Sequence, residues 1–156
     1  MIVRFRLNGR EETADVRPAQ SLLETLRALG CHSVRGACDT SGCGVCTVWV
    51  DEKPVLSCSY PAARAQGKRV TTIEGLREEA EELVNALADE GAEQCGFCSP
   101  GLLMTALAML REYGDPTDDE IRAYLAGNLC RCSGYASQMR ALRGLLERRR
   151  ARGGNV

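Results

Sequence analysis

The chain has 156 residues, of which 44% are hydrophobic and 4% aromatic, and its formal net charge is −1; this length fits one domain or two small domains that share an interface. The balanced charge and the absence of basic residues interleaved with aromatic ones exclude a typical nucleic-acid-binding protein. No stretch approaches the roughly 18 apolar residues of a membrane span, and arginines interrupt the apolar N-terminal segment, which is not typical of a signal peptide, so we expect a cytoplasmic protein.

The N-terminal residues predict a β-hairpin. Residues 3–7 alternate between apolar side chains and arginines, which is the pattern of a half-buried strand. Asn8-Gly9 follows, and this dipeptide is a strong signal for a two-residue hairpin turn. We therefore expect a second strand at about residues 12–16.

A helix comes next, followed by a loop and three more strands. Ser21 and Glu24 have the spacing of a capping box that opens a helix, and Gly30 ends it. Residues 31–46 contain glycines and cysteines without periodicity, so they are predicted to form a loop. Pro54 suggests that the strand beside it lies at a sheet edge. The three strands are expected at residues 47–50, 55–56 and 70–73.

The second half of the chain predicts helices only. Ser99-Pro100 reads as an N-cap followed by a proline in the first helical position. Thr117 and Glu120 form another capping box. Apolar side chains recur at helical spacing in four stretches, which begin near residues 76, 99, 117 and 135.

The two halves differ in class, so we predict an α+β protein of two domains. Residues 1–75 are expected to form a small ferredoxin-like domain, and residues 76–156 a four-helix bundle. A domain of this length buries only a modest share of its surface by itself. A metal centre in such a domain would therefore help to hold it together.

Four cysteines of the first half have the spacing of a plant-type [2Fe–2S] site. Cys38, Cys43 and Cys46 follow the pattern C-x4-C-x2-C, and Cys58 is a more distant fourth. Three thiolates on one loop can surround a cluster while the fourth arrives from a neighbouring segment. Glycines in the loop let the backbone turn tightly and direct N–H groups at the sulfurs. A zinc site that uses the C-x2-C pair is the alternative.

A second group of four cysteines lies in the helical half. Cys95 and Cys98 precede one predicted helix, and Cys130 and Cys132 lie between the last two. Two loops at one end of a bundle could present four thiolates to a metal, and the helix that begins at Ser99 would direct its positive N-terminus toward them. C-x-C is a poor zinc arm. Alone this group is ambiguous, but beside the first group it predicts a second cluster.

The remaining residues predict no catalytic site. We interpret Cys31 as a small buried hydrophobic residue at a helix end. His32 is the only histidine, so the chain cannot supply the two that a Rieske centre requires, and no Ser/His/Asp set can be proposed. The basic residues near the C-terminus are expected to form a solvated tail, with an acidic partner as the alternative; they are Arg148, Arg149, Arg150 and Arg152.

Longer motifs around both cysteine groups resemble those of the iron–sulfur subunits of molybdenum hydroxylases. The resemblance rests on GACDTSGCGVCTV at residues 36–48 with Ser57-Cys58, on QCGFCSPG at residues 94–101 and on GNLCRCSGY at residues 127–135. It covers nearly the whole chain, and two independent four-cysteine motifs in the same order make it specific. The family includes carbon monoxide dehydrogenase, xanthine dehydrogenase and aldehyde oxidase.

The resemblance implies a β-grasp domain of the plant ferredoxin type followed by a four-helix bundle, each with one [2Fe–2S] cluster. It also implies a large partner subunit that carries a molybdopterin cofactor, usually a medium subunit that carries FAD, and assembly as a dimer of heterotrimers. Two electrons from the molybdenum site would leave singly through the bundle cluster and then the ferredoxin-like cluster to the flavin. By the same resemblance, Gln94 and Cys132 would lie against the pterin.

We therefore predict an electron-transfer subunit of a molybdopterin-dependent oxidoreductase, with no substrate site of its own. The alternatives are a free-standing ferredoxin-like carrier, a zinc-stapled interaction module, and a subunit of the reductive branch that resembles 4-hydroxybenzoyl-CoA reductase. The expected ligands are Cys38, Cys43, Cys46 and Cys58 for one cluster and Cys95, Cys98, Cys130 and Cys132 for the other.

Overall fold

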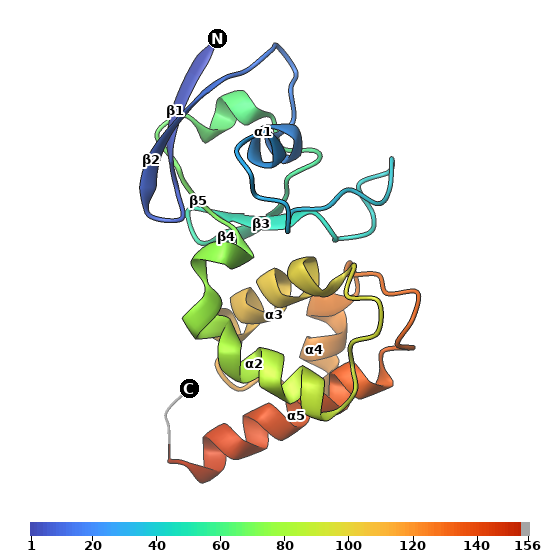
Figure 1. Ribbon diagram of the computed structural model, residues 1–156. Helices are drawn as coiled ribbons and strands as arrows, with labels where there is room; N and C mark the ends of the chain where they lie inside the picture. The colour runs from blue at the N-terminus through green and yellow to red at the C-terminus, as the bar shows by residue number, and fades with distance from the viewer. Residues whose placement is uncertain (154–156) are drawn as a thin grey trace.

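The N-terminal half contains five strands, which are β1 (Ile2–Leu7), β2 (Arg10–Asp15), β3 (Thr47–Val50), β4 (Lys53–Leu56) and β5 (Arg69–Thr71). They form one sheet in the order β2-β1-β5-β3-β4 (Figure 1). β1 and β5 pair in parallel, and the other neighbours pair antiparallel. The computed structural model describes residues 1–153, and within them the predicted α+β fold is confirmed.

The predicted strands are all present, with ends that shift by about one or two residues. Asn8 and Gly9 have φ angles of +48° and +84°, as expected for a two-residue turn between antiparallel strands. Pro54 lies in β4, at the edge of the sheet, where its missing N–H costs no ladder hydrogen bond. Ile73 was predicted to end the last strand, but it lies outside the sheet and begins the 3-10 turn η2 (Ile73–Gly75).

Helix α1 (Leu22–Ala28) packs on the sheet, and the predicted capping box opens it. The Ser21 hydroxyl accepts a hydrogen bond from the N–H of Glu24 (3.2 Å), and the Glu24 carboxylate accepts one from the N–H of Ser21 (2.9 Å). The 3-10 helix η1 (Ala62–Ala65) was not predicted from the sequence. The core between these elements includes Val3, Phe5, Val16, Leu22, Leu26, Val48, Ala65 and Val70.

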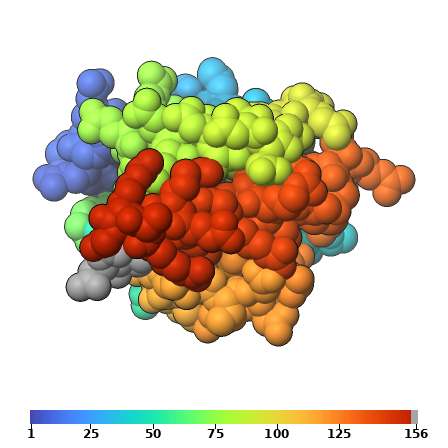
Figure 2. All heavy atoms as spheres, turned by 90° about the horizontal axis from the view of Figure 1, so that it is seen from below, coloured from blue at the N-terminus to red at the C-terminus, as the bar shows by residue number. Residues whose placement is uncertain are grey.

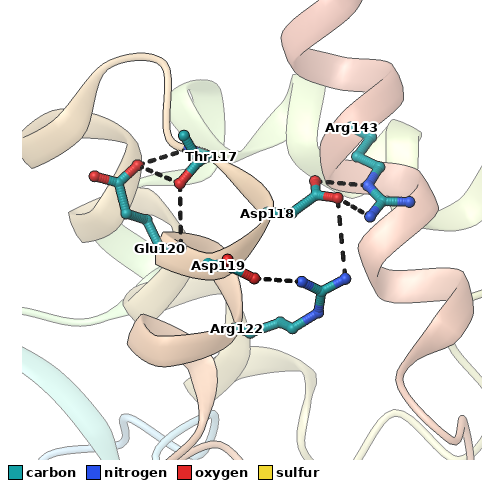
Figure 3. A network of polar contacts seen from close by, with 6 residues as sticks. All are labelled: Thr117, Asp118, Asp119, Glu120, Arg122 and Arg143. Carbon is teal, nitrogen blue, oxygen red and sulfur yellow. Dashed lines mark hydrogen bonds and ion pairs between the residues drawn. The ribbon is translucent and has the colours of Figure 1, made fainter.

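The C-terminal half contains four α-helices, which are α2 (Arg77–Asp89), α3 (Ser99–Tyr113), α4 (Asp118–Leu125) and α5 (Ala136–Ala151). The predicted N-cap of α3 is wrong by one residue: Cys98 is the cap, and Ser99 is already helical. The Ser99 hydroxyl donates to the Glu93 carboxylate instead (2.6 Å). The capping box of α4 is confirmed, and the Glu120 carboxylate accepts hydrogen bonds from Thr117 (Figure 3).

Helix α3 lies in the middle of the molecule, between β3 and the other helices (Figure 1). All ten residues from 101 to 110 are buried. Trp49 of β3 enters the core of the helical half, where its indole N–H donates to the carbonyl oxygen of Met104 (2.8 Å). The guanidinium of Arg111 lies 4.3 Å from the centre of the indole ring. This shared core fixes the two halves against each other. The predicted domain boundary after residue 75 stays a prediction.

Ion pairs join the outer helices. Helix α5 lies between α2 and α4 (Figure 2), and Arg143 of α5 binds Asp118 at the start of α4 (Figure 3). The C-terminal arginines were predicted to form a solvated tail, yet Arg149 binds Glu82 (2.9 Å) and Arg150 binds Asp115. The Arg150–Asp115 pair is exposed, and exposed pairs contribute about 0–1 kcal/mol each. Among the described residues, no helix has both the length and the hydropathy to cross a membrane.

Candidate metal centres

The first cysteine set lies on two adjacent segments of the ferredoxin-like half. Cys38, Cys43 and Cys46 lie on the loop between α1 and β3, and Cys58 lies in the turn that follows β4. Cys46 is buried and the other three are half-buried. The thiols lie in two neighbouring pairs, since the Cys43 thiol is among the groups that shift the pKa of Cys38, and Cys58 is among those that shift the pKa of Cys46. The structure therefore places the four predicted residues in one region as two neighbouring pairs, and their role as ligands stays a prediction.

The loop directs hydrogen-bond donors at one sulfur of this set. Hydrogen bonds from the Cys43 thiol and from backbone N–H groups of the same loop lower the pKa of Cys38 to about 6. Burial raises the pKa of Cys46 to about 11. Because the thiolate is the form that binds metal, the N–H groups around Cys38 favour that form at neutral pH. Gly42 supplies one of these N–H groups, and the effect of such groups on a cluster stays a prediction.

The second set comes from two links of the helical half. Cys95 and Cys98 lie between α2 and α3, and Cys130 and Cys132 lie between α4 and α5. These thiols also lie in pairs: the sulfurs of Cys95 and Cys132 are 3.5 Å apart, and the Cys98 and Cys130 thiols are close enough to shift each other's pKa. The loop that precedes β3, the link between α2 and α3 and the link between α4 and α5 project from the same side of the molecule (Figure 1).

Local contacts distinguish the inner pair of this set. Burial raises the pKa of Cys98 to about 11, with the Cys130 thiol acting in the same direction. Burial also raises the pKa of Cys130, but hydrogen bonds from Ser133 outweigh it and lower that pKa to about 7. The hydroxyl and the N–H of Ser133 lie 3.2 and 3.3 Å from the Cys130 sulfur. The link between α4 and α5 thus supplies, from Ser133, hydrogen-bond donors to the sulfur of Cys130.

The paired arrangement bears on which metal the cysteines can hold. A structural zinc site needs four ligands that converge on one ion. Within residues 1–153, no three His, Cys, Asp or Glu side chains converge in this way. A binuclear cluster with four cysteine ligands has two thiolates on each iron, which matches two neighbouring pairs in each set. The donor chemistry and this pairing fit a [2Fe–2S] cluster better than zinc.

The residues predicted to lie against the pterin are neighbours at the surface. The Gln94 side-chain amide donates to the carbonyl oxygen of Cys132 (3.2 Å), and the Cys132 thiol is exposed. Large apolar side chains lie near these two residues, with exposed fractions of 44% for Phe97, 51% for Leu129 and 42% for Tyr135. These three line a groove of about 540 Å³ together with cysteines of both sets.

Two residues that sequence reasoning missed join the cysteine loops. The Arg35 guanidinium donates to the carbonyl oxygen of Gly96 (2.6 Å) and lies 5.2 Å from the Phe97 ring centre. Asn128 is buried and donates to the carbonyl oxygen of Gly44 (3.2 Å). The sequence signal for Asn128 was its position two residues before the predicted ligand Cys130. Cys31 lies in the core of the ferredoxin-like half, apart from both sets.

Both halves of the chain match known families of iron–sulfur proteins. Residues 5–74 match the family described as "2Fe-2S iron-sulfur cluster binding domain", and residues 72–143 match the "[2Fe-2S] binding domain" family. The chain is 38% identical to the nicotinate dehydrogenase small FeS subunit of Eubacterium barkeri, covering 94% of this chain and 95% of that protein.

Two further relatives cover most of the chain. The xanthine dehydrogenase iron-sulfur-binding subunit of Escherichia coli O157:H7 is 44% identical over 83% of this chain and 84% of its own length. The crystal structure of quinoline 2-oxidoreductase from Pseudomonas putida 86 superposes with a TM-score of 0.89 at 34% identity, covering 100% of this chain and 98% of the matched chain. The likeness therefore extends over both cysteine sets.

Proposed function

This chain belongs to the iron–sulfur subunits of the molybdenum hydroxylase family, and from that membership we propose that it relays single electrons between a molybdenum site and FAD on partner subunits. The observation that carries the proposal is the presence of two separate four-cysteine sets, each arranged as two thiol pairs. When bound, each [2Fe–2S] cluster supplies a centre that accepts and releases one electron. The chain's own residues hold and separate the two centres.

We assign the ligands of the ferredoxin-like half in pairs. Cys38 and Cys43 are proposed for one iron, and Cys46 and Cys58 for the other, because these thiols are already neighbours. The backbone donors around Cys38 and the burial of Cys46 give the two irons different surroundings. Hydrogen bonds and solvent exposure are among the factors that set the potential of such a cluster.

In the helical half, we likewise assign neighbouring thiols to the same iron. Cys95 and Cys132, which are exposed, are proposed for one iron, and the less exposed Cys98 and Cys130 for the other. The exposed pair faces outward beside Gln94. This exposure supports the proposal that, in the complex, the pair Cys95 and Cys132 lies nearest the pterin of the partner subunit.

We further propose that the exposed apolar side chains around this pair contact a large molybdopterin-binding subunit. Phe97, Leu129 and Tyr135 are each more than 40% exposed, and clusters of exposed large apolar residues mark interaction surfaces. An FAD-binding subunit would receive the electrons, and the assembly would be a dimer of heterotrimers in the cytoplasm. The substrate would bind in the large subunit, so this chain would contribute no catalytic residue.

Metal analysis tests the cluster assignment. Purified protein should contain roughly four irons per chain with an equal amount of acid-labile sulfide, as two binuclear clusters require. Zinc without sulfide would refute the proposal. Cys132→Ser should disturb the electron paramagnetic resonance (EPR) signal of the helical cluster alone, and Cys58→Ser that of the other cluster alone. Cys31→Ala is the matched control, because this buried cysteine is not a proposed ligand, and it should leave both signals unchanged.

Copurification tests the partners. Expression with its neighbouring genes should yield a complex that contains molybdenum and flavin together with this chain. A chain that remains monomeric, carries both clusters and binds no molybdenum protein would instead be a free-standing carrier.

A further inference from the structure

A backbone hydrogen bond joins the two cysteine sets directly. The N–H of Leu129 donates to the carbonyl oxygen of Cys43, with 2.9 Å between nitrogen and oxygen. Cys43 belongs to the loop set, and Leu129 immediately precedes Cys130 of the helical set. One hydrogen bond and one peptide link therefore connect a proposed ligand of one cluster with a proposed ligand of the other.

A buried asparagine holds this contact in place. Asn128 is only 8% exposed, and its side-chain amide donates to the carbonyl oxygen of Gly44 (3.2 Å). Its backbone N–H donates to the carbonyl oxygen of Leu125 at the end of α4 (2.9 Å). The residue is thus anchored to the helical half and reaches into the cysteine loop of the other half. Removing the donor would leave a buried polar group without its partner, which is costly.

Glycines allow the two segments to approach this closely. Gly44 has a φ of +70°, and a Cβ atom there would collide with the carbonyl oxygen of Gly127 and lie 2.7 Å from the side-chain nitrogen of Asn128. On the other side, a Cβ atom at Gly101 would lie 2.5 Å from the carbonyl oxygen of Gly44. No side chain fits between these segments, so the spacing of the two cysteine loops is fixed by backbone contact.

We propose that Asn128 is a positioning residue that sets the spacing of the two clusters, and that the hydrogen bond between Leu129 and Cys43 is a bonded route for electrons between them. This inference rests on the proposed function. Electronic coupling through covalent and hydrogen bonds falls off more slowly than coupling through a gap of equal length. A shift of Asn128 would therefore weaken the coupling without removing any thiolate.

The test compares two asparagine variants in the cluster-loaded chain. Asn128→Asp keeps the size of the side chain but replaces the amide donor with a carboxylate that faces a carbonyl oxygen. Asn85→Asp makes the same chemical change on the exposed surface of α2 and serves as the matched control. The measurements are the iron content, the magnetic interaction between the two reduced clusters in the EPR spectrum, and the rate at which an added electron equilibrates between them.

We expect Asn128→Asp to retain roughly four irons per chain, to show a changed magnetic interaction and to equilibrate electrons several-fold more slowly than the control. Full iron content with an unchanged interaction and rate would overturn the inference while leaving the proposed function intact. A wild-type chain without iron and sulfide would instead refute the proposed function.

A second variant covers the case in which the aspartate destabilises the fold. Asn128→Ala removes the donor without adding a charge, and it should show the same changes with both clusters present. If both variants lost the helical cluster and kept the other, Asn128 would be a residue that holds that cluster, and the inference would be wrong.

Discussion

Alanine at Gly101 should destabilise the protein, although alanine normally stabilises a helix. Gly101 lies in the first turn of α3, and a Cβ atom there would lie 2.5 and 2.7 Å from the carbonyl oxygens of Gly44 and Val45. These are backbone atoms of the cysteine loop, so α3 or the loop must move by about 1 Å. Overpacking of this kind costs about 1–3 kcal/mol, whereas replacing glycine in a helix returns about 0.5–1 kcal/mol. We expect a net loss of about 1–2 kcal/mol in the free energy of unfolding.

The same substitution at Gly144 is the matched control. Gly144 lies within α5, and a Cβ atom there would meet only the far end of the Arg148 side chain, at 3.3 Å. Because that side chain can move, Gly144→Ala should raise the free energy of unfolding by about 0.5–1 kcal/mol.

Urea unfolding measures both variants. The fluorescence of Trp49, the only tryptophan, reports the interface between the halves, and far-UV circular dichroism reports the helices. Variants that shift the unfolding midpoint in the same direction, or a Gly101→Ala protein as stable as the wild type, would refute the role of backbone contact at this interface.

Three further predictions concern the helical half and the metal. Thr117→Ala removes the capping box with Glu120 and should lower the free energy of unfolding by about 1 kcal/mol; an unchanged urea midpoint would contradict it. Burial and a hydrogen bond to Glu112 raise the pKa of Tyr124 to about 12, so the stabilisation that this tyrosine contributes is present at lower pH and is lost as the pH rises through that value. Ultraviolet titration should show one late-ionising tyrosine, which Tyr124→Phe removes. Removing iron with a chelator under reducing conditions should lower the thermal midpoint, because the cysteine loops then lose the centre that connects them; zinc should not restore the visible absorption.

Local sequence signals predicted the elements whose contacts are local. The capping boxes at Ser21 and Thr117 each join residues three positions apart, and Asn8-Gly9 specifies its turn by its own φ angles. The cap predicted at Ser99 failed because its hydroxyl binds Glu93, six positions earlier. A competing partner outside the capping pattern is not visible in the motif itself.

The division of the cysteines into two sets could be predicted because their spacing is a property of the chain, and their role as ligands stays a prediction. The contacts between the sets could not be predicted, because they join residues far apart in the sequence, such as Asn128 and Gly44, which are 84 positions apart. The insertion of Trp49 into the core of the helical half was likewise missed, since a short strand such as β3, buried along its whole length, does not show which element covers each face. Composition and periodicity predict helices and strands, whereas the interface between the two halves depends on how the shapes of their surfaces fit together.

The position of β5 determines the order in which the protein can be completed during synthesis. β5 is the last strand along the chain but lies at the centre of the sheet, between β1 and β3. The hairpins β1–β2 and β3–β4 form from neighbouring residues, yet they join only when β5 pairs with both β1 and β3. Such distant pairing is slow, because the chain must close a long loop first. We therefore expect the cysteine loop to acquire a fixed frame only after residue 71 has been synthesised, and insertion of a first cluster to follow translation of the entire sheet.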